Sequence, residues 1–383
     1  MAKNSVVILL LSVSFLVGLG LVMLFSTGAF AHDAKGDAFH FLRQQGKWLV
    51  LGTIACTVAA FTDYHYLGKC WWVLFLVAAV LLALCYVPHV GMLLNGSRRW
   101  IHFGPVAFQP SEVGKLAAVV MLAWWFTKYE QQSSHFWRGF LAPLMIVSVL
   151  MILIVAEEDL GTTMLICCTS VAVMFIAGSN FFFMLLLGGG GFAAILLRAS
   201  HMKDRLDRLT AFMDLEAHKE GAGLQQWWAL IAFGSGGVDG VGLGESRTKM
   251  QYLPYAHTDF IFPIVGEELG LKITLLVVLA FLLVTLSGVM ISMQARDRFG
   301  MLLGFGLVMT ITIQACVNIG MTTALLPNKG MPLPFISSGG SNLCVCLFFV
   351  GVLINIYRQG AQQTELGASI STDRLVERST PRV

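Results

Sequence analysis

The 383-residue sequence contains very little charge, since Asp, Glu, Lys and Arg together make up only 12% of it. Soluble domains carry about 25% of these residues. Hydrophobic residues reach 56% and the mean hydropathy is +0.75, which excludes an ordinary soluble domain. The net charge of +3 is not gathered into a basic tract, which excludes a typical nucleic-acid partner. The sequence therefore indicates a polytopic membrane protein.

The eight cysteines lack the spacing of a metal site. Seven of them lie in apolar runs, where cysteine packs as a small hydrophobic residue: Cys56, Cys85, Cys167, Cys168, Cys316, Cys344 and Cys346. We therefore expect them to be structural.

Ten apolar segments approach the roughly 20 residues that cross a bilayer. They are 5–25, 46–61, 70–90, 111–129, 140–156, 160–177, 181–197, 260–290, 299–325 and 336–357. We therefore predict an all-α protein of ten transmembrane helices, forming one membrane domain over residues 1–358. The first segment is longer than a signal-peptide core and is predicted to be an uncleaved span. The polar tail, 359–383, is predicted to be disordered.

A polar insert, residues 198–258, separates the seventh and eighth predicted spans. It contains Trp227 and Trp228 among apolar residues, which predicts a short helix lying at the membrane interface. The glycines between 234 and 244 predict a loop after it.

The loops that follow odd-numbered spans must all lie on one side of the membrane. The chemically unusual stretches all fall in them, at 95–100, 109–112, 157–161, 257–259 and 326–341. We therefore predict that five loops converge on one site. More than half of the 25 lysines and arginines lie on that side, which by the positive-inside rule points the site to the cytoplasm. A bound anion explains these cations equally well, so the charge count leaves the orientation open.

Asp259 is the first candidate for chemistry, because it lies at the mouth of a long apolar segment, where an ionisable group is costly. A helix beginning close by would favour its ionised form. Pro263 implies that the helix either starts near Phe262 or kinks there. Glu267 and Glu268, deeper in the segment, are interpreted as helix-packing or pathway groups.

Two pairs of residues are candidates for holding a phosphate. Arg98 and Arg99 can form forked hydrogen bonds to an anion, or they can be an interfacial pair that only anchors the loop. Glu112 and Lys115 share one face at a helix start, which fits a structural ion pair as well as a site.

Glu157, Glu158 and Asp159 place three carboxylates in one turn. Like charges this close favour a basic partner or a divalent metal among them, and the alternative is a solvated hairpin turn.

Lys329 lies in a proline-rich stretch that is predicted to be an extended loop. Gly330 can provide a tight turn that carries the lysine over the mouth of the bundle, and Ser337 and Ser341 follow as hydrogen-bond donors. A solvated lysine is the alternative.

These motifs resemble the SEDS family, to which FtsW and RodA belong. The resemblance is carried by 95–101, 109–112, 158–162, 257–270 and 326–337, in this order. It implies ten spans, cytoplasmic termini and motif loops that face outward. It also implies peptidoglycan glycosyltransferase activity on lipid II, with Asp259 as the catalytic residue. Residues 242–246 and 329–335 are more similar to the division branch than to the elongation branch, which implies the septal membrane, a class B penicillin-binding protein and other division proteins as partners.

Glycosyl transfer needs a base for the acceptor hydroxyl and cations for the diphosphate leaving group. Asp259 is predicted to be the base. The predicted substrate-binding residues are Arg98, Arg99, Glu112, Lys115, Asp159, Arg205, Arg208, His257, Lys329, Ser337 and Ser341. A divalent cation, Mg or Mn, is a further candidate. A flippase for a polyprenyl diphosphate is the alternative function, because buried charges and a broken helix also suit a transport path. A division scaffold explains neither the loop convergence nor Asp259.

The sequence departs from the family pattern at four places. Glu157 and Glu158 stand where the family usually has Gln-Pro, Tyr255 where it often has Glu, Trp228 where it tends to have Gln, and Ser338 where it usually has Tyr. These positions leave any supporting role for their side chains open.

Overall fold

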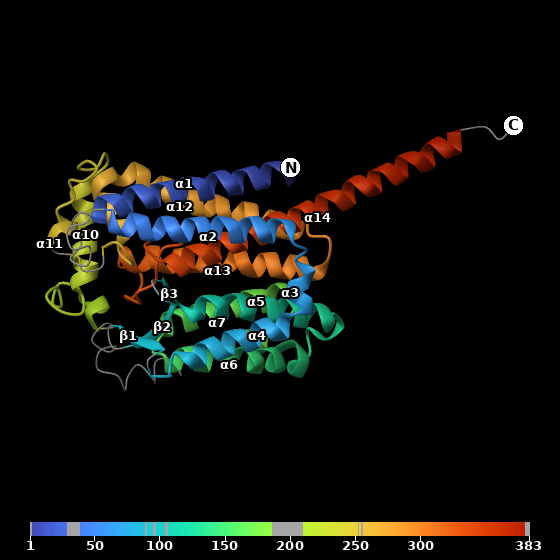
Figure 1. Ribbon diagram of the computed structural model, residues 1–383, viewed down its shortest axis with the longest axis horizontal. Coiled ribbons are helices and arrows are strands. Elements are labelled where there is room, and N and C mark those ends of the chain that lie inside the picture. Colours follow the sequence, from blue (N-terminus) through green and yellow to red (C-terminus); the bar gives the residue numbers. More distant parts are fainter. Residues whose placement is uncertain are drawn as a thin grey trace.

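The computed structural model describes residues 2–28, 39–88, 90–94, 97–103, 106–185, 210–251, 253 and 256–379. Long helices run roughly side by side and form a bundle (Figure 1). They are α1 (Ala2–Gly28), α2 (His40–Phe61), α4 (Trp71–Leu84), α5 (Pro110–Lys128), α6 (Ala142–Ala156), α7 (Leu160–Ile176), α12 (Ile261–Met293), α13 (Arg298–Thr322) and α14 (Gly340–Ser379). The predicted helical membrane fold is thus present.

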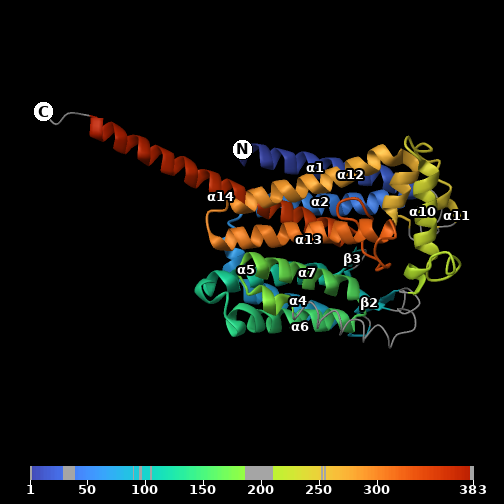
Figure 2. The ribbon, with the colours of Figure 1, turned by 180° about the vertical axis from the view of Figure 1, so that it is seen from behind.

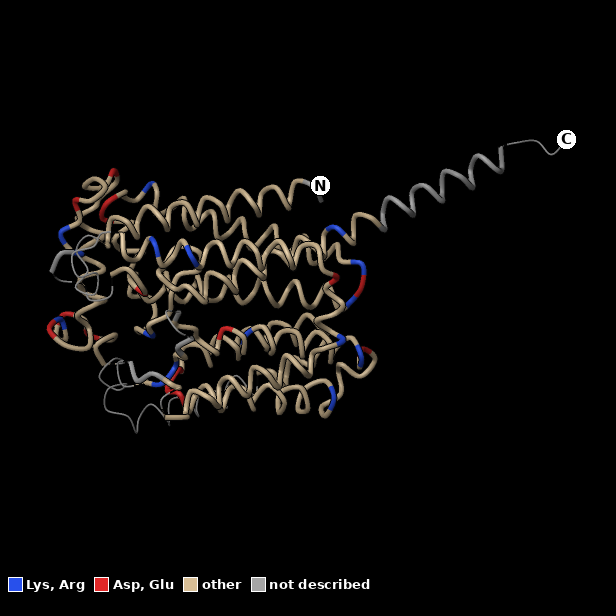
Figure 3. Tube along the Cα trace, in the orientation of Figure 1, with Lys and Arg blue, Asp and Glu red and all other residues tan. Residues whose placement is uncertain are grey.

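Five of the described helical segments are long and apolar enough to cross a membrane. They are Asn4–Gly28, Phe136–Ala156, Ile261–Met293, Arg298–Thr322 and Gly340–Gln362, and α4 and α7 are shorter apolar helices. Large apolar side chains such as Leu11, Ile152 and Leu275 point outward and are more than half exposed. An outer surface of this kind suits lipid, and charged residues gather mainly at the two ends of the bundle (Figure 3).

The helices form two groups (Figures 1 and 2). One contains α1, α2, α12, α13 and α14, and the other contains α4, α5, α6 and α7. Helix α13 joins the groups because it packs against α5 and α7 as well as α12. Short elements close the ends: α3 (His65–Lys69), η2 (Glu130–Gln132), the π-helical turn η3 (Phe136–Leu141), α10 (Leu224–Gly236) and α11 (Thr248–Gln251).

The prediction of an all-α fold is wrong in one place. The loop after α4 forms a three-stranded antiparallel sheet of β1 (Gly91–Leu94), β2 (Ser97–Phe103) and β3 (Val106–Phe108). The third predicted span extended to residue 90, but α4 ends at Leu84. Pro88 follows closely, and the residue before a proline disfavours helical geometry.

Other boundaries differ by several residues. Helix α2 begins at His40 and not at 46, and α14 begins at Gly340 and not at 336, because the proline-rich segment before it is not helical. Helix α14 continues to Ser379, where the sequence predicted a disordered tail, and this part projects from the bundle (Figure 1). Most of the seventh predicted span, 186–197, lies outside the described residues.

The insert contains the predicted short helix, α10, which runs across the ends of the long helices (Figures 1 and 2). The predicted glycine-rich loop begins later than expected, because α10 includes Gly234 and Gly236. A Cβ on Gly236 would lie 2.1 Å from the carbonyl oxygen of Gly266. That glycine therefore allows α10 to cross closely over α12.

Candidate functional site

A cavity of about 460 Å³ opens at the end of the bundle that carries the sheet and α10. Its lining comes from β2, the start of α5, the α6–α7 turn, the segment before α12, and the segment between α13 and α14. The five predicted loops therefore meet in one place. Seven of the predicted site residues line it: Arg99, Glu112, Lys115, Asp159, His257, Asp259 and Ser341.

Asp259 lies two residues before α12, close to the positive end of the helix. Gly330 has a positive φ of 60°, and a Cβ there would lie 3.1 Å from Oδ2 of Asp259, so the loop before α14 passes directly over the carboxylate. Asn318 of α13 donates to the carbonyl oxygens of Asp259 (2.9 Å) and Met331 (2.6 Å) and holds both segments.

Burial raises the pKa of Asp259 to about 6, with Arg99 acting to lower it and Asp159 to raise it. A carboxylate in this range is ionised at neutral pH and can still accept a proton with useful driving force. Helix α12 starts at Ile261, so Pro263 lies in its first turn and the first of the two predicted alternatives holds. The break in α12 is further on, at Gly270, where φ is 75°.

A bulge in β2 separates the two adjacent arginines. Met92 pairs with Trp100 and Leu93 with Arg98, which leaves Arg99 as the extra residue. Arg99 lines the cavity, whereas Arg98 is exposed and does not.

Asp159, in the turn between α6 and α7, faces Arg99 of β2 across the edge of the cavity. Its Oδ1 lies 3.9 Å from Nη1 of Arg99 and accepts from the backbone nitrogen of Thr162 at 3.0 Å, which caps α7. Its Oδ2 accepts from the Thr162 hydroxyl (2.8 Å) and the Gln109 amide (3.2 Å). Asp159 is therefore a well-satisfied carboxylate near Arg99, whose Nε donates to the Ser97 hydroxyl at 2.7 Å.

A buried polar network forms the inner wall of the cavity. Lys115 Nζ lies 2.7 Å from Glu112 and 2.9 Å from Gln314 of α13. Asn342 of α14 donates to both oxygens of Glu112 at 3.2 Å. The network ties three helices together, so the structure shows the ion pair and places it at the site.

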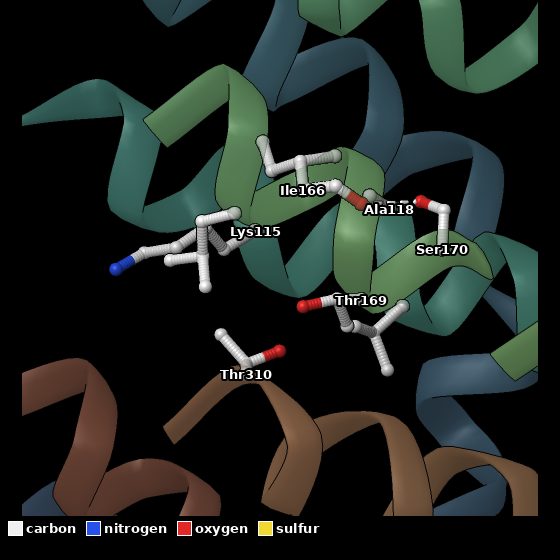
Figure 4. Close-up of a pocket in the computed structure, with 8 residues that line it drawn as sticks. Lys115, Ala118, Ile166, Thr169, Ser170 and Thr310 are labelled. Carbon is white, nitrogen blue, oxygen red and sulfur yellow. Dashed lines mark hydrogen bonds between the residues drawn. The ribbon is translucent and has the colours of Figure 1, made fainter. Parts of the chain in front are cut away.

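A narrow space beside Lys115 is lined mainly by apolar side chains, with three hydroxyl-bearing residues among them (Figure 4). Thr169 and Ser170 of α7 and Thr310 of α13 face it. Thr169 Oγ1 is buried and has no hydrogen-bond partner among the described residues.

The remaining predicted residues divide into three groups. The His257 ring stacks on Phe41 at 4.2 Å, and the Ser341 hydroxyl is buried without a partner in the described part of the chain. Ser337 and Lys329 do not line the cavity, and the Ser337 hydroxyl accepts from the backbone nitrogen of Leu333. Arg205 and Arg208 lie outside the described residues, as does Tyr255.

The other departures from the family pattern have distinct surroundings. Glu157 is buried, its side-chain oxygens have no hydrogen-bond partner in the described ranges, and burial raises its pKa to about 8. Glu158 has a φ of 64°, which a proline cannot adopt, so this turn differs from one built on Gln-Pro. Trp228 packs partly buried against the core, and the backbone nitrogen of Ser338 donates to the His257 carbonyl at 2.9 Å.

Glu267 and Glu268 have the helix-packing role. Glu267 accepts from the Ser246 hydroxyl at 2.5 Å, and Glu268 pairs with Lys249 at 2.5 Å and accepts from Ser26. They thereby fasten α1 and the insert to α12.

Sequence reasoning missed three buried amides, Gln314, Asn318 and Asn342. Each lies in an apolar helix and bonds a functional segment. The signal was available, because a polar side chain within a membrane helix is costly unless it has a partner.

Among the described residues, no three His, Cys, Asp or Glu side chains form a group that could hold a metal. Asp159 and Asp259 both face the cavity, which is the number of carboxylates that a phosphate-bound Mg²⁺ commonly uses.

A family model described as "Cell cycle protein" (FTSW_RODA_SPOVE) matches residues 7–362. The chain belongs to this family. It is 36% identical over 355 residues to "Probable peptidoglycan glycosyltransferase FtsW" of Geobacter metallireducens, covering 92% of this chain and 94% of that protein. It is also 37% identical over 362 residues to "Stage V sporulation protein E" of Bacillus subtilis, covering 93% and 98%. The resemblance inferred from the motifs is thus confirmed, and the relatives are of the FtsW kind.

Two solved structures share the fold. A chain described under "Structural coordination of polymerization and crosslinking by a peptidoglycan synthase complex" has a TM-score of 0.76 at 24% identity, covering 92% of this chain and 98% of that one. The rod shape determining protein RodA of Thermus thermophilus has a TM-score of 0.67 at 24% identity, covering 91% and 95%.

Proposed function

We propose that this protein is a peptidoglycan glycosyltransferase that joins lipid II disaccharide units into glycan strands during septal wall synthesis. The observation that carries the proposal is the Asp259 carboxylate, which faces a polar cavity beside Arg99 at one end of an apolar bundle. Relatives at 36% identity over nearly the full chain are named probable peptidoglycan glycosyltransferases, which supports it.

In the proposed reaction, the 4-hydroxyl oxygen of the acceptor sugar attacks the anomeric carbon of the donor. The new C–O bond forms as the bond from that carbon to the diphosphate oxygen breaks. Asp259 accepts the hydroxyl proton, and the lipid diphosphate leaves as an anion. A base with a pKa of about 6 suits this step at neutral pH.

The departing diphosphate needs positive charge where its own charge develops. Arg99 and Lys115 face the cavity and are our first candidates. The Ser341 hydroxyl, buried without a partner among the described residues, is a candidate donor. Further proposed contacts of lipid II are Arg98, Arg205, Arg208, His257, Lys329 and Ser337. Glu112 and Asp159 are proposed to orient Lys115 and Arg99, respectively.

A divalent cation would be held by Asp259 and Asp159 together with the donor's phosphates. When bound, it would neutralise diphosphate charge.

We further propose ten transmembrane helices with cytoplasmic termini, so that the cavity and the insert 198–258 face away from the cytoplasm. The proposed location is the cytoplasmic membrane at the division septum. The proposed partners are a class B penicillin-binding protein and other division proteins. A solved structure with the same fold comes from a complex that combines polymerisation and crosslinking, which supports a transpeptidase partner.

A flippase for the same lipid is the second candidate, favoured by the buried Glu112–Lys115 pair and the break of α12 at Gly270. Purified full-length protein supplied with labelled lipid II distinguishes the two. We expect glycan polymer without any membrane gradient. We also expect Asp259→Asn to remain monodisperse and to form none. Polymer at the wild-type rate from that variant would exclude Asp259 as the base, and no polymer from wild type would favour the transporter.

A further inference from the structure

A second polar cavity lies at the end of the bundle remote from Asp259, where α2 passes into α3 (Figure 1). It measures about 350 Å³, and its lining includes Asp63, Arg296, Asn355, Arg358 and Gln359. These residues come from the α2–α3 turn, the α12–α13 turn and the middle of α14. The proposed glycosyl transfer uses none of them.

An apolar groove of about 410 Å³ adjoins this cavity, and Asp63 lines both. The groove runs between α2, α3, α4 and α14 and is lined by side chains such as Leu74, Val77, Phe348 and Val352. Val77 is 46% exposed, so this side of the groove is open to the surroundings. The polar cavity and the apolar groove therefore adjoin at Asp63, and we refer to the two together as the depression.

Helix α14 shows how the two halves are arranged. Residues 348, 352, 355, 359 and 362 follow one another at spacings of three and four, and so share one face of the helix. Phe348 and Val352 line the groove, whereas Asn355, Gln359 and Gln362 line the polar cavity. The depression is thus polar at the end of the bundle and apolar toward its middle, as is a phospholipid in a bilayer leaflet.

The charges of the polar half favour an anion. Neither Arg296 nor Arg358 forms an ion pair with a carboxylate within the described residues. Arg358 donates to the Ala60 carbonyl at 3.0 Å and lies 4.4 Å over the Phe61 ring, which fixes its position. Lys69 lies 5.2 Å over the ring of Tyr66, a groove residue, and adds a cation at the rim.

Asp63 is the opposing charge, but it already has partners. It accepts from Gln359 at 2.8 Å and from the backbone nitrogen of His65 at 3.0 Å, and the His65 ring lies 2.7 Å away. The polar half therefore contains two arginines and one carboxylate, Asp63, whose charge is already stabilised by these hydrogen bonds, and its net charge is positive.

We propose that this depression binds an anionic phospholipid, with the phosphate at Arg296 and Arg358 and one acyl chain in the groove between α2, α4 and α14. Basic pockets between membrane helices hold anionic headgroups in this way. The site is separate from the proposed lipid II cavity and fastens the α2–α3 turn against α14.

Native mass spectrometry of the full-length protein with equal amounts of phosphatidylglycerol and phosphatidylcholine tests the proposal. We expect phosphatidylglycerol to be retained preferentially. Arg296→Gln and Arg358→Gln should each weaken its binding roughly fivefold, the scale of one cation near an anionic surface. Arg138→Gln, a cation at the same end of the bundle but outside the depression, is the matched control and should change nothing.

A second pair of variants tests the acyl chain. Val77→Trp fills the groove and should also release phosphatidylglycerol, whereas Val80→Trp, on the same helix, 50% exposed and outside the groove, should not. Equal retention of both lipids, or unchanged binding in the double arginine variant, would overturn the proposal. It would also be overturned if glycerol phosphate displaced the lipid and Val77→Trp had no effect, because the site would then bind a soluble anion.

Discussion

The Asp259 carboxyl combines burial with a neighbouring guanidinium, and these act on its pKa in opposite directions. Because the proposed base must be ionised, polymerisation should rise with pH through about 6 and be lost below it. Arg99→Gln removes the charge that lowers this pKa, so the acidic limb should move to higher pH. The pH dependence of kcat/KM for lipid II measures both effects. A lower rate with an unmoved limb would mean that Arg99 acts on the diphosphate or on the structure and does not set the pKa of Asp259.

Glu157 offers a second test of how burial changes the pKa of a carboxyl group. Its pKa is about 4.5 when unperturbed and is raised by burial to about 8 in the folded protein, although the nearby Cys85 thiol lowers it. The unfolded chain therefore loses this proton before the folded chain does, and folding stability should fall as pH rises from about 4.5 to 8.

Glu157→Gln removes the ionisation and keeps the shape. Its Tm in detergent should exceed that of wild type by a margin that grows between pH 5 and pH 8. Glu158→Gln, at the exposed neighbouring residue, is the control and should show no such growth. A constant difference across this range would contradict the role of burial.

At the residue scale, the sequence identifies most of the charged residues that line the cavity, because each ionisable side chain stands out in an apolar chain. It could not show which member of a pair faces the cavity. Arg98 and Arg99 are separated by a bulge that depends on pairing with Met92 and Leu93. The buried amides, such as Gln314, were missed because their importance comes from neighbours distant in sequence.

Helix α12 shows how an element is shaped by its neighbour. At Gly270 the chain leaves helical geometry, and the backbone nitrogens of Leu271 and Lys272 bond instead to the carbonyls of Gly237 and Val238. A Cβ on Gly270 would lie 2.4 Å from the nitrogen of Gly240.

Gly270→Ala should therefore destabilise the protein by more than the roughly 1–3 kcal/mol expected for this glycine-only backbone conformation alone. The expected result is a lower Tm and weaker polymerisation, because the insert, whose end leads into the segment with Asp259, loses its attachment to α12. Gly18→Ala, in α1 with nothing within 4 Å of the added Cβ, should leave both unchanged or raise the Tm slightly. Equal Tm values for the two variants would refute the importance of the break.

The helices were predictable because about 20 apolar residues have few alternatives to helix in a membrane. The sheet was not, since its strands are short and the described strands pair with one another within one loop. The glycines of α10 were misinterpreted because glycine is favoured both in flexible loops and where one helix crosses closely over another. The sequence alone does not distinguish these two uses.

At the scale of the molecule, the bundle has two chemically different ends. The sheet and the insert lie at one end, where the cavity of Asp259 opens, and α3 lies at the other (Figure 1). The depression at Arg296 and Arg358 adjoins the α2–α3 turn at that second end. Helix α5 runs from the cavity to the opposite end, so Glu216 in the insert and Ser134 after α5 should lie on opposite sides of the membrane whichever way the protein is oriented.

A cysteine introduced at one of these positions at a time, in a background without the exposed Cys70 and Cys316, tests the proposed orientation. An impermeant thiol reagent applied to intact spheroplasts should label Glu216→Cys at once and Ser134→Cys only after permeabilisation. The reverse pattern would place the cavity in the cytoplasm, as the count of lysines and arginines alone suggests, and would exclude polymerisation of lipid II on the outer side. Labelling of both from outside would contradict the spanning arrangement of α5 itself. The physical reason to expect the first result rests on the proposed function: if the cations around the cavity bind a diphosphate, they do not report the electrostatics that orient loops during insertion.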